Sequence, residues 1–195
     1  MLSIAKARVI VFCLGFAIGL AGDATHVASG TTAYDWDGVP TLWNSAIWFP
    51  FLVAFAVLAA AEVGHRAALP TRPRTWSHVV AGSSAVLALY ALTSTLRGQP
   101  MTVSMVLCSA IAVAIWAWWD PTLPVLAFAV GAAILGPVAE MIVVAIGAAH
   151  YASDVDSLGG VAPWLTCIYF AAGSVASGVL GALTRQPSRT AVSTG

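Results

Sequence analysis

The stretch Ile115-Trp116-Ala117-Trp118-Trp119-Asp120 places three indoles at the end of an apolar, charge-free run and closes it with a carboxylate. Indole rings favour the headgroup level of a bilayer, because their apolar body and their N–H donor are both accommodated there. The pattern is typical of a helix that leaves a membrane. It therefore predicts that a transmembrane helix ends near residue 119.

The composition of the whole chain agrees with a membrane protein. Hydrophobic residues make up 59% of the 195 residues and charged residues 8%, and the mean hydropathy is +0.89. A soluble domain, with about 25% charged residues, could not cover its surface with so little charge. The formal net charge is zero, so no basic field attracts nucleic acid, and we exclude nucleic-acid binding.

Apolar runs separated by turn and breaker residues predict an all-α integral membrane protein, a single bundle of six transmembrane helices. Each run is close to the ~20 residues that a helix needs to cross the hydrocarbon. The predicted spans are residues 4–22, 42–64, 76–96, 101–119, 122–149 and 161–183. Residues 184–195 are expected to form a flexible tail, and residues 1–195 to form one transmembrane domain.

The basic residues predict the orientation, because short cytoplasmic loops accumulate Lys and Arg. With six spans, Arg97 alone falls on one side of the membrane. The other side carries Lys6, Arg8, Arg66, Arg72, Arg74, Arg185 and Arg189. Both termini are therefore expected to be cytoplasmic.

The first run has a second interpretation. Lys6 and Arg8, followed by a short apolar stretch that ends near Gly22, also resemble a secretory signal peptide, whose cleavage would leave five spans. The cleavage pattern is poor, and Gly15 and Gly19 have the spacing of a helix-packing face. We therefore favour a first transmembrane helix.

Candidate metal ligands and catalytic groups are scattered. The three cysteines fall in three different predicted spans, without a ligand spacing. His26, with Asp23, Asp35 and Asp37 nearby, could form a metal site in the first outer loop, although a solvated loop is the simpler interpretation. No nucleotide-binding, hydrolase or metalloprotease motif stands in a meaningful context. We expect no metal, no cofactor and no catalytic residue.

Glu140 lies well inside the fifth predicted span, three residues after Gly136-Pro137. An ionised carboxylate there costs at least ~3 kcal/mol, so it must be neutral, paired or hydrated. Pro137 cannot donate a helical N–H and displaces the carbonyl of Ala133, and freed backbone groups beside an acid can line a cavity. In the alternative, Glu140 pairs with a Ser, Thr or indole N–H of a neighbouring helix and only holds the bundle together.

Three aromatic tracts resemble the Insig (insulin-induced gene) family. Asn44-Ser45-Ala46-Ile47-Trp48-Phe49-Pro50 is similar to Ser-Ser-Ala-Trp-Trp-Val-Pro in the family's second span, and residues 115–120 are similar to Leu-Trp-Trp-Thr-Phe-Asp at the end of its fourth. Trp164-Leu165-Thr166-Cys167-Ile168-Tyr169-Phe170 resembles Trp-Leu-Pro-Cys-Ile-Phe-Phe, and Gly173 also matches. The tracts keep their order and their numbered spans, so the resemblance covers roughly residues 41–183.

The resemblance implies a six-helix protein of the endoplasmic reticulum that binds oxysterols in a cavity among its helices and, when loaded, retains the escort protein Scap. Trp116 matches a family tryptophan near the sterol cavity, and Asp120 matches a cytoplasmic-turn aspartate implicated in partner binding. The sequence after Asp120, Pro-Thr-Leu-Pro, departs from the family's basic, serine-containing turn. Val103 stands roughly where the family has a cavity glutamine, with Gln99 one turn earlier. A Scap-like partner is therefore in doubt.

The composition also bears on origin and ligand. One Lys, one Asn and abundant Ala, Gly, Val and Pro indicate a GC-rich, bacterial genome, and hence the bacterial plasma membrane rather than the endoplasmic reticulum. The occupant of an apolar cavity would then be a membrane lipid such as diacylglycerol, or a sterol-like or isoprenoid molecule. Apolar walls would hold its chains and a few polar groups its hydroxyl or ester. The residues predicted to line the cavity are Asn44, Trp48, Gln99, Trp116 and Glu140.

We therefore expect a non-enzymatic, Insig-like lipid-binding protein that acts as a lipid sensor and forms a homo-oligomer through its small-residue faces. The alternative is an intramembrane transporter or lipid-modifying enzyme in which Glu140 is a proton relay or general base. A transporter is expected to show internal repeats and paired broken helices. The sequence shows one convincing break, at Gly136-Pro137.

Overall fold

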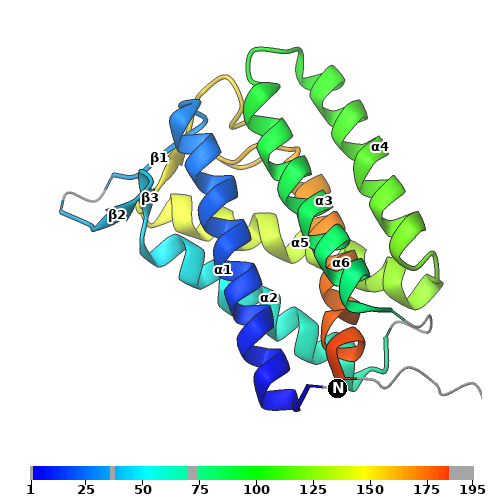
Figure 1. Cartoon of the computed structure of the whole chain (residues 1–195). Coiled ribbons are helices and arrows are strands. Elements are labelled where there is room, and N and C mark those ends of the chain that lie inside the picture. Colours follow the sequence, from blue (N-terminus) through cyan, green and yellow to red (C-terminus); the bar gives the residue numbers. More distant parts are fainter. Residues whose placement is uncertain (1, 36–37, 70–73, 185–195) are drawn as a thin grey trace, which may run out of the picture.

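The computed structural model describes residues 2–35, 38–69 and 74–184, and these form a six-helix bundle with two short β-ribbons (Figure 1). All six helices are long and apolar enough to cross a membrane, which confirms the predicted fold. The helices are α1 (Ile4–Ala28), α2 (Trp48–Arg66), α3 (Trp76–Thr95), α4 (Met101–Trp119), α5 (Leu123–Ala145) and α6 (Leu165–Thr184). The strands are β1 (Thr32–Ala33), β2 (Thr41–Leu42), β3 (Ser45–Ala46) and β4 (His150–Tyr151).

Helix α6 is the centre of the bundle. It contacts each of the other five helices, and 72% of its most apolar segment is buried, against 17–33% in the others. Small residues allow this close packing, because they let two helix backbones approach each other. Gly64 of α2, for example, lies against the backbone of Ser177 and leaves no room there for a Cβ.

The two ends of the described chain meet at one end of the bundle, which we call the terminal end. The Leu2 N–H donates to the Leu183 carbonyl there, at 3.4 Å. The opposite end, which we call the ribbon end, carries the antiparallel pairs β1–β4 and β2–β3. Because the helices alternate in direction, the basic residues of the described chain separate as the sequence predicts. Arg97 lies at the ribbon end, and Lys6, Arg8, Arg66 and Arg74 lie at the terminal end.

The boundaries of several spans differ from the prediction. Residues 42–47 do not belong to the second span, because β2 and β3 form a hairpin whose two turn residues, Trp43 (φ 52°) and Asn44 (φ 66°), are left-handed. Two such residues are typical of a type I′ turn, in which Asn is favoured. Helix α1 continues to Ala28, six residues beyond the predicted end. The fifth and sixth helices are shorter than predicted, and residues 185–195 of the predicted tail lie outside the described residues.

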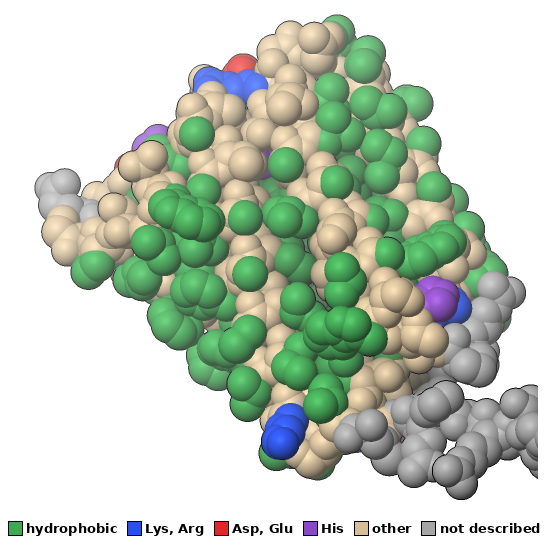
Figure 2. All heavy atoms as spheres, viewed as in Figure 1, with side chains coloured by type: hydrophobic (Ala, Val, Ile, Leu, Met, Phe, Trp, Pro, Cys, Tyr) green, Lys and Arg blue, Asp and Glu red, His purple; other side chains and the backbone are tan. Residues whose placement is uncertain are grey.

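The outside of the bundle is apolar, and Figure 2 shows hydrophobic side chains spread over the face presented by its helices. Large exposed side chains occur on α4 and α5, where Val106 is 71% and Leu135 70% exposed. Charged groups are confined to the helix ends and the loops in the described chain, apart from two buried carboxylates, Asp23 and Glu140. The surface is therefore suited to contact with lipid chains.

Candidate functional site

The ribbon end of the bundle contains the two buried carboxylates of the helices and the four tyrosines of the chain, three of which donate hydrogen bonds to these carboxylates. Asp23 is 2% and Glu140 6% exposed. The tyrosines are buried or half-buried around them. We call this group the tyrosine–carboxylate cluster, and its members are Asp23, Tyr34, Tyr90, Glu140, Tyr151 and Tyr169.

Glu140, near the end of α5, accepts hydrogen bonds from two tyrosines. The Tyr169 hydroxyl donates to Oε1 at 2.7 Å and the Tyr151 hydroxyl to Oε2 at 3.3 Å. Gly136, one turn earlier, makes this possible, because a Cβ there would overlap the Tyr169 ring. Helix α5 runs on through Pro137. The Gly136-Pro137 segment thus allows the Tyr169 ring of α6 to pack against α5.

Asp23, in the last turns of α1, is held in a similar way. The Tyr34 hydroxyl donates to Oδ2 at 2.5 Å. Ser45 is fully buried near both groups, and its hydroxyl has no hydrogen-bond partner among the described residues. Trp48 packs edge-on against the Tyr34 ring, with 5.6 Å between the ring centroids. Burial raises the pKa of the Tyr34 hydroxyl far above its ordinary value, and the Asp23 charge raises it further. Tyr34 therefore remains a protonated donor.

The two halves of the cluster are electrostatically connected. Asp23 lies within electrostatic range of Glu140, and Tyr90 lies within electrostatic range of both carboxylates. Burial, followed by the charge of Glu140, raises the pKa of the Tyr151 hydroxyl well above its ordinary value, so this group also remains a donor. Among the described residues, neither Asp23 nor Glu140 forms an ion pair with a basic side chain.

His26 extends the cluster toward α3. Its ring is fully buried, with centroids 4.7 Å from Tyr90 and 5.0 Å from Trp164. The Nε2 atom lies 2.7 Å from the Thr93 hydroxyl, which itself donates to the Tyr90 carbonyl at 2.6 Å. The Nδ1 atom has no hydrogen-bond partner among the described residues.

The placement of His26 and Asp23 corrects the interpretation of residues 23–37 as an outer loop. Both side chains are buried because α1 continues to Ala28. Asp35 instead pairs with His150, at 2.7 Å between Oδ1 and Nδ1, and Asp37 lies outside the described residues. Within the described chain, no three His, Cys, Asp or Glu residues are grouped so that they could hold a metal ion.

Polar contacts at the surface join the two loop segments that supply Tyr34 and Tyr151. Arg97 donates to the Ser29 carbonyl and forms an ion pair with Asp154 at 3.6 Å. The β1–β4 ladder and the pair between Asp35 and His150 connect the same segments. These contacts hold together the two loop segments that supply Tyr34 and Tyr151.

Of the six residues predicted to bind a ligand or a partner, the structure brings two to the cluster. Glu140 is a member of it, and Trp48 packs on Tyr34. Asn44 and Gln99 lie apart from the cluster. Asn44 is an exposed turn residue of the β2–β3 hairpin, and Gln99 is exposed in the connection from α3 to α4.

Trp116 and Asp120 lie at the terminal end of α4, at the far end of the bundle from the cluster. Trp116 is half-buried, and its Nε1 is buried without a hydrogen-bond partner in the described chain. Asp120 is fully buried, and its backbone N–H donates to the Trp116 carbonyl at 2.8 Å. The turn after α4 therefore does not present this carboxylate on the surface.

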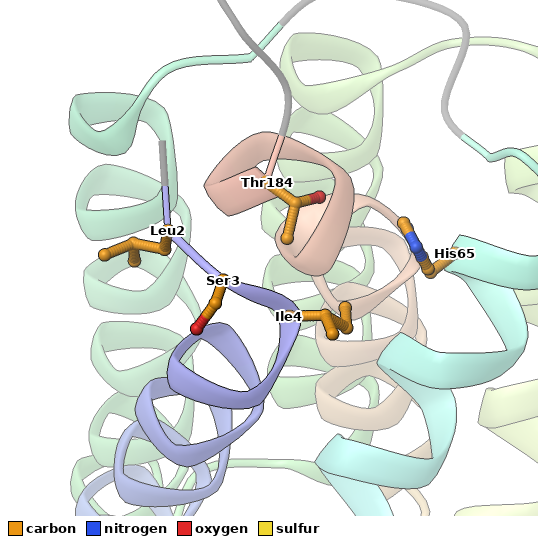
Figure 3. A pocket seen from close by; sticks show the side chains of 5 residues that line it. All are labelled: Leu2, Ser3, Ile4, His65 and Thr184. Atoms are coloured by element: carbon orange, nitrogen blue, oxygen red, sulfur yellow. The ribbon is translucent and has the colours of Figure 1, made fainter.

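A separate hollow of about 660 Å³ lies at the terminal end, where the start of α1 meets the ends of α2 and α6 (Figure 3). Its lining residues are Leu2, Ser3, Ile4, His65 and Thr184. Neither the predicted ligand-binding residues nor the tyrosine–carboxylate cluster contribute to it. The hollow and the cluster are therefore distinct features at opposite ends of the bundle.

Comparison with known proteins identifies the family. No family model matches the chain. An Insig protein homologue from Mycolicibacterium vanbaalenii is 38% identical over 182 residues, which cover 92% of this chain and 88% of that protein. This chain belongs to the Insig family.

The Insig fold is also supported by solved structures. The crystal structure of a mycobacterial Insig homologue from Mycobacterium vanbaalenii matches with a TM-score of 0.84 at 36% identity, and the match covers 93% of this chain and 96% of the homologue. A crystal structure of a cross-linked trimer of a cysteine variant of that homologue matches equally well. The Insig resemblance inferred from the three aromatic tracts is thus confirmed.

Proposed function

We propose that this Insig-family membrane protein binds a membrane lipid between its helices, with the polar part of the lipid at the tyrosine–carboxylate cluster. The observation that carries the proposal is the depth of the cluster. Glu140 lies five residues before the end of α5, which is roughly 7.5 Å along a helix axis. In a hydrocarbon layer of about 30 Å, this position is close to the headgroup level.

The surroundings of the cluster support the same proposal. A lipid site needs apolar walls and a few polar groups, because an unpaired polar group in hydrocarbon is unfavourable. The helices that supply Asp23 and Glu140, α1 and α5, are predominantly apolar over their length. Diacylglycerol, with two apolar chains and one free hydroxyl, is the uncharged lipid that we propose as a ligand. A sterol-like or isoprenoid molecule also combines an apolar body with a small polar group. Binding of such a lipid would make the protein a lipid sensor.

The charges of the chain and its mycobacterial relative support a proposal for its place in the cell. Lys6, Arg8, Arg66 and Arg74 at the terminal end favour a cytoplasmic location for both termini. The mycobacterial relative supports a bacterial plasma membrane. The ribbon end, and the cluster with it, would then face the outer leaflet.

We also propose that the protein is a homo-oligomer without enzymatic activity. The cross-linked trimer of the mycobacterial homologue supports self-association, and exposed apolar faces on α4 and α5 offer surfaces for it. The burial of Asp120 argues against a Scap-like partner that reads this residue. The described residues of the cluster supply hydrogen bonds to carboxylates but no nucleophile paired with a base.

The alternative function, a transporter or lipid-modifying enzyme, has one observation in its favour. Glu140 lies between two tyrosine hydroxyls and within electrostatic range of Asp23, an arrangement through which a proton could pass. Under this alternative, Glu140→Gln abolishes a proton-coupled flux or a turnover. Under the binding proposal, the substitution changes ligand affinity and stability only.

The binding proposal is tested by purifying the full chain in mild detergent and identifying the lipids that co-purify by mass spectrometry. We expect one lipid class in stoichiometric amount, and a rise in Tm when that lipid is added back to delipidated protein. Absence of both a stoichiometric lipid and a thermal shift would count against a lipid site.

A further inference from the structure

The hollow at the terminal end has the size and the depth of a headgroup site. Its volume of about 660 Å³ lies within the roughly 300–1,000 Å³ of ordinary ligand pockets. Three helix ends form it, because Ile4 is the first residue of α1, His65 the last but one of α2 and Thr184 the last of α6 (Figure 3). Helices α2 and α6 have 19 and 20 residues, which is roughly 28–30 Å and about the thickness of the hydrocarbon layer. Their ends are therefore close to the headgroup level.

Two polar side chains of the hollow have a hydrogen that they can donate to a ligand. The Oγ of Ser3 accepts the Lys6 N–H at 3.4 Å, so its own hydroxyl hydrogen is not used in that bond. The His65 ring forms no hydrogen bond with the described residues, and an imidazole carries at least one N–H donor. Thr184 differs, since its hydroxyl donates to the Leu180 carbonyl at 2.7 Å. None of the described residues that line the hollow is a carboxylate, so the donors suit an anion.

The charged residues beside the hollow are predominantly basic. Lys6 and Arg8 lie in the first turns of α1, and Arg66 follows His65 directly. Glu62 is the one carboxylate of these turns, and Arg8 donates to both of its oxygens, at 2.5 and 3.2 Å. Arg66 pairs with the same carboxylate at 3.6 Å. Three basic side chains against one carboxylate leave a positive charge, and Lys6 is exposed and forms no ion pair with the described residues.

An anionic phospholipid matches these features. Leu2 and Ile4 provide apolar walls for the glycerol and for the first methylenes of its chains, which a free phosphate lacks. The excess of basic groups is limited to this end of the described bundle, because Asp35 and Asp154 at the ribbon end outnumber Arg97. The terminal end meets the leaflet that we propose to be cytoplasmic, and anionic lipids of that leaflet attract basic segments.

We propose that the hollow binds the headgroup of an anionic phospholipid from the leaflet that meets the terminal end. Ser3 and His65 donate hydrogen bonds to the phosphate. Leu2 and Ile4 contact the glycerol and the upper part of the chains. The basic residues of α1 and α2 attract the negative charge. This site is separate from the tyrosine–carboxylate cluster, and it does not depend on lipid binding there.

The proposal is tested by titration of delipidated full-length protein in mild non-ionic detergent with three probes. Short-chain phosphatidylglycerol is anionic, phosphatidylcholine with the same chains is zwitterionic, and glycerol 3-phosphate carries the phosphate without chains. The readouts are the Kd and the shift in Tm, at low and at high salt. We expect phosphatidylglycerol to bind about tenfold more tightly than the other two probes at low salt. The difference from phosphatidylcholine should shrink at high salt, because salt screens exposed charges.

Two variants assign the binding to the hollow. His65→Ala removes a phosphate donor and should weaken both phospholipids about fivefold or more. Arg66→Gln removes a charge and should reduce the preference for phosphatidylglycerol. Arg97→Gln is the matched control at the ribbon end, because Arg97, like Arg66, forms an ion pair with a carboxylate at 3.6 Å. His150→Ala is the corresponding control for the histidine, and both controls should bind phosphatidylglycerol like the wild type.

Three results would overturn the proposal. Equal affinity of wild-type protein for phosphatidylglycerol and phosphatidylcholine at low salt would show that the site does not select an anion. Glycerol 3-phosphate that binds as tightly as phosphatidylglycerol would show a site for a free anion rather than for a lipid. Unchanged affinity in His65→Ala, or an equal loss in the two control variants, would place the lipid outside the hollow. The comparison of the probes on wild-type protein needs no variant, so a folding defect would not obscure it.

Discussion

The Tyr169 hydroxyl, in the first turns of α6, donates a 2.7 Å hydrogen bond to Glu140 near the end of α5. The bond joins the central helix of the bundle to a long helix at its periphery, and it satisfies a carboxylate oxygen that has little access to water. Gly136 provides the space for the Tyr169 ring. The same three residues therefore determine both the packing of α5 on α6 and the position of the acid.

Gly136→Ala should destabilise the protein. A Cβ at this position overlaps the Tyr169 ring, and overpacking of this kind costs about 1–3 kcal/mol. Gly131→Ala is the control on the same helix, because no described atom lies within 4 Å of the added Cβ, and alanine is there the better helix former. The free energy of unfolding in detergent should fall for the first variant and stay equal or rise for the second. Equal effects would show that the Tyr169 ring does not lie against α5.

Tyr169→Phe should also destabilise, for a different reason. The ring keeps its volume, but Oε1 of Glu140 loses its donor, and an unsatisfied buried group costs about 1–3 kcal/mol. Tyr90→Phe is the comparison, because the Tyr90 hydroxyl forms no hydrogen bond with the described residues. The loss in free energy of unfolding should be larger for Tyr169→Phe. The reverse order would contradict the assignment of Tyr169 as the principal donor to Glu140.

Arg97→Gln should loosen the ribbon end without unfolding the bundle. The substitution removes the ion pair with Asp154 and weakens the contact with the Ser29 carbonyl, and an exposed pair of this kind is worth about 0–1 kcal/mol. Hydrogen exchange of residues 29–35 and 150–156 should become faster, while α6 remains protected. Arg66→Gln, at the terminal end, should leave the exchange of these two segments unchanged. Unchanged exchange in Arg97→Gln would show that the contact does not hold the loops.

The two ends of the bundle should be accessible from opposite sides of the membrane. Ala67, after α2, and Gln99, after α3, are both exposed, and a cysteine introduced at either site can react with a membrane-impermeant maleimide. In intact bacterial cells we expect Gln99→Cys to be labelled and Ala67→Cys to be protected until the membrane is opened. If only Ala67→Cys were labelled in intact cells, the protein would have the opposite orientation to the one proposed.

The six-helix fold could be predicted from the sequence because each span is a long apolar run bounded by breakers. The prediction that residues 42–47 belong to the second transmembrane helix is wrong for a simple reason. Leu42 and Trp43 are apolar and extend the predicted second span, while the Trp43-Asn44 turn gives only a weak signal without Gly. The sequence predicts the end of α1 too early, because the polar residues Asp23 and His26 resemble a loop when the tertiary partners that satisfy them are unknown.

The candidate site was predicted only in part, because its members come from distant parts of the chain. Glu140 can be recognised from the sequence because it is an acid in an apolar run. Tyr34 and Tyr151 cannot be linked to it in the same way, because they are separated from each other by more than half of the sequence. No local spacing connects them, since the β1–β4 ladder and the helix packing bring them together. The sequence does contain one signal that could have helped. All four tyrosines lie in the loops or in the halves of the predicted spans on the side opposite to most basic residues.

The central claim, that a lipid places its polar part at the tyrosine–carboxylate cluster, is tested most directly by photocrosslinking. A lipid with a diazirine beside its headgroup is added to the purified protein, and the labelled peptides are identified by mass spectrometry. We expect the label on residues 23–34 or 140–151, and we expect excess unlabelled lipid to remove it. A label on residues 116–120 or around the hollow at Leu2 and His65, with residues 23–34 and 140–151 unlabelled, would contradict the account.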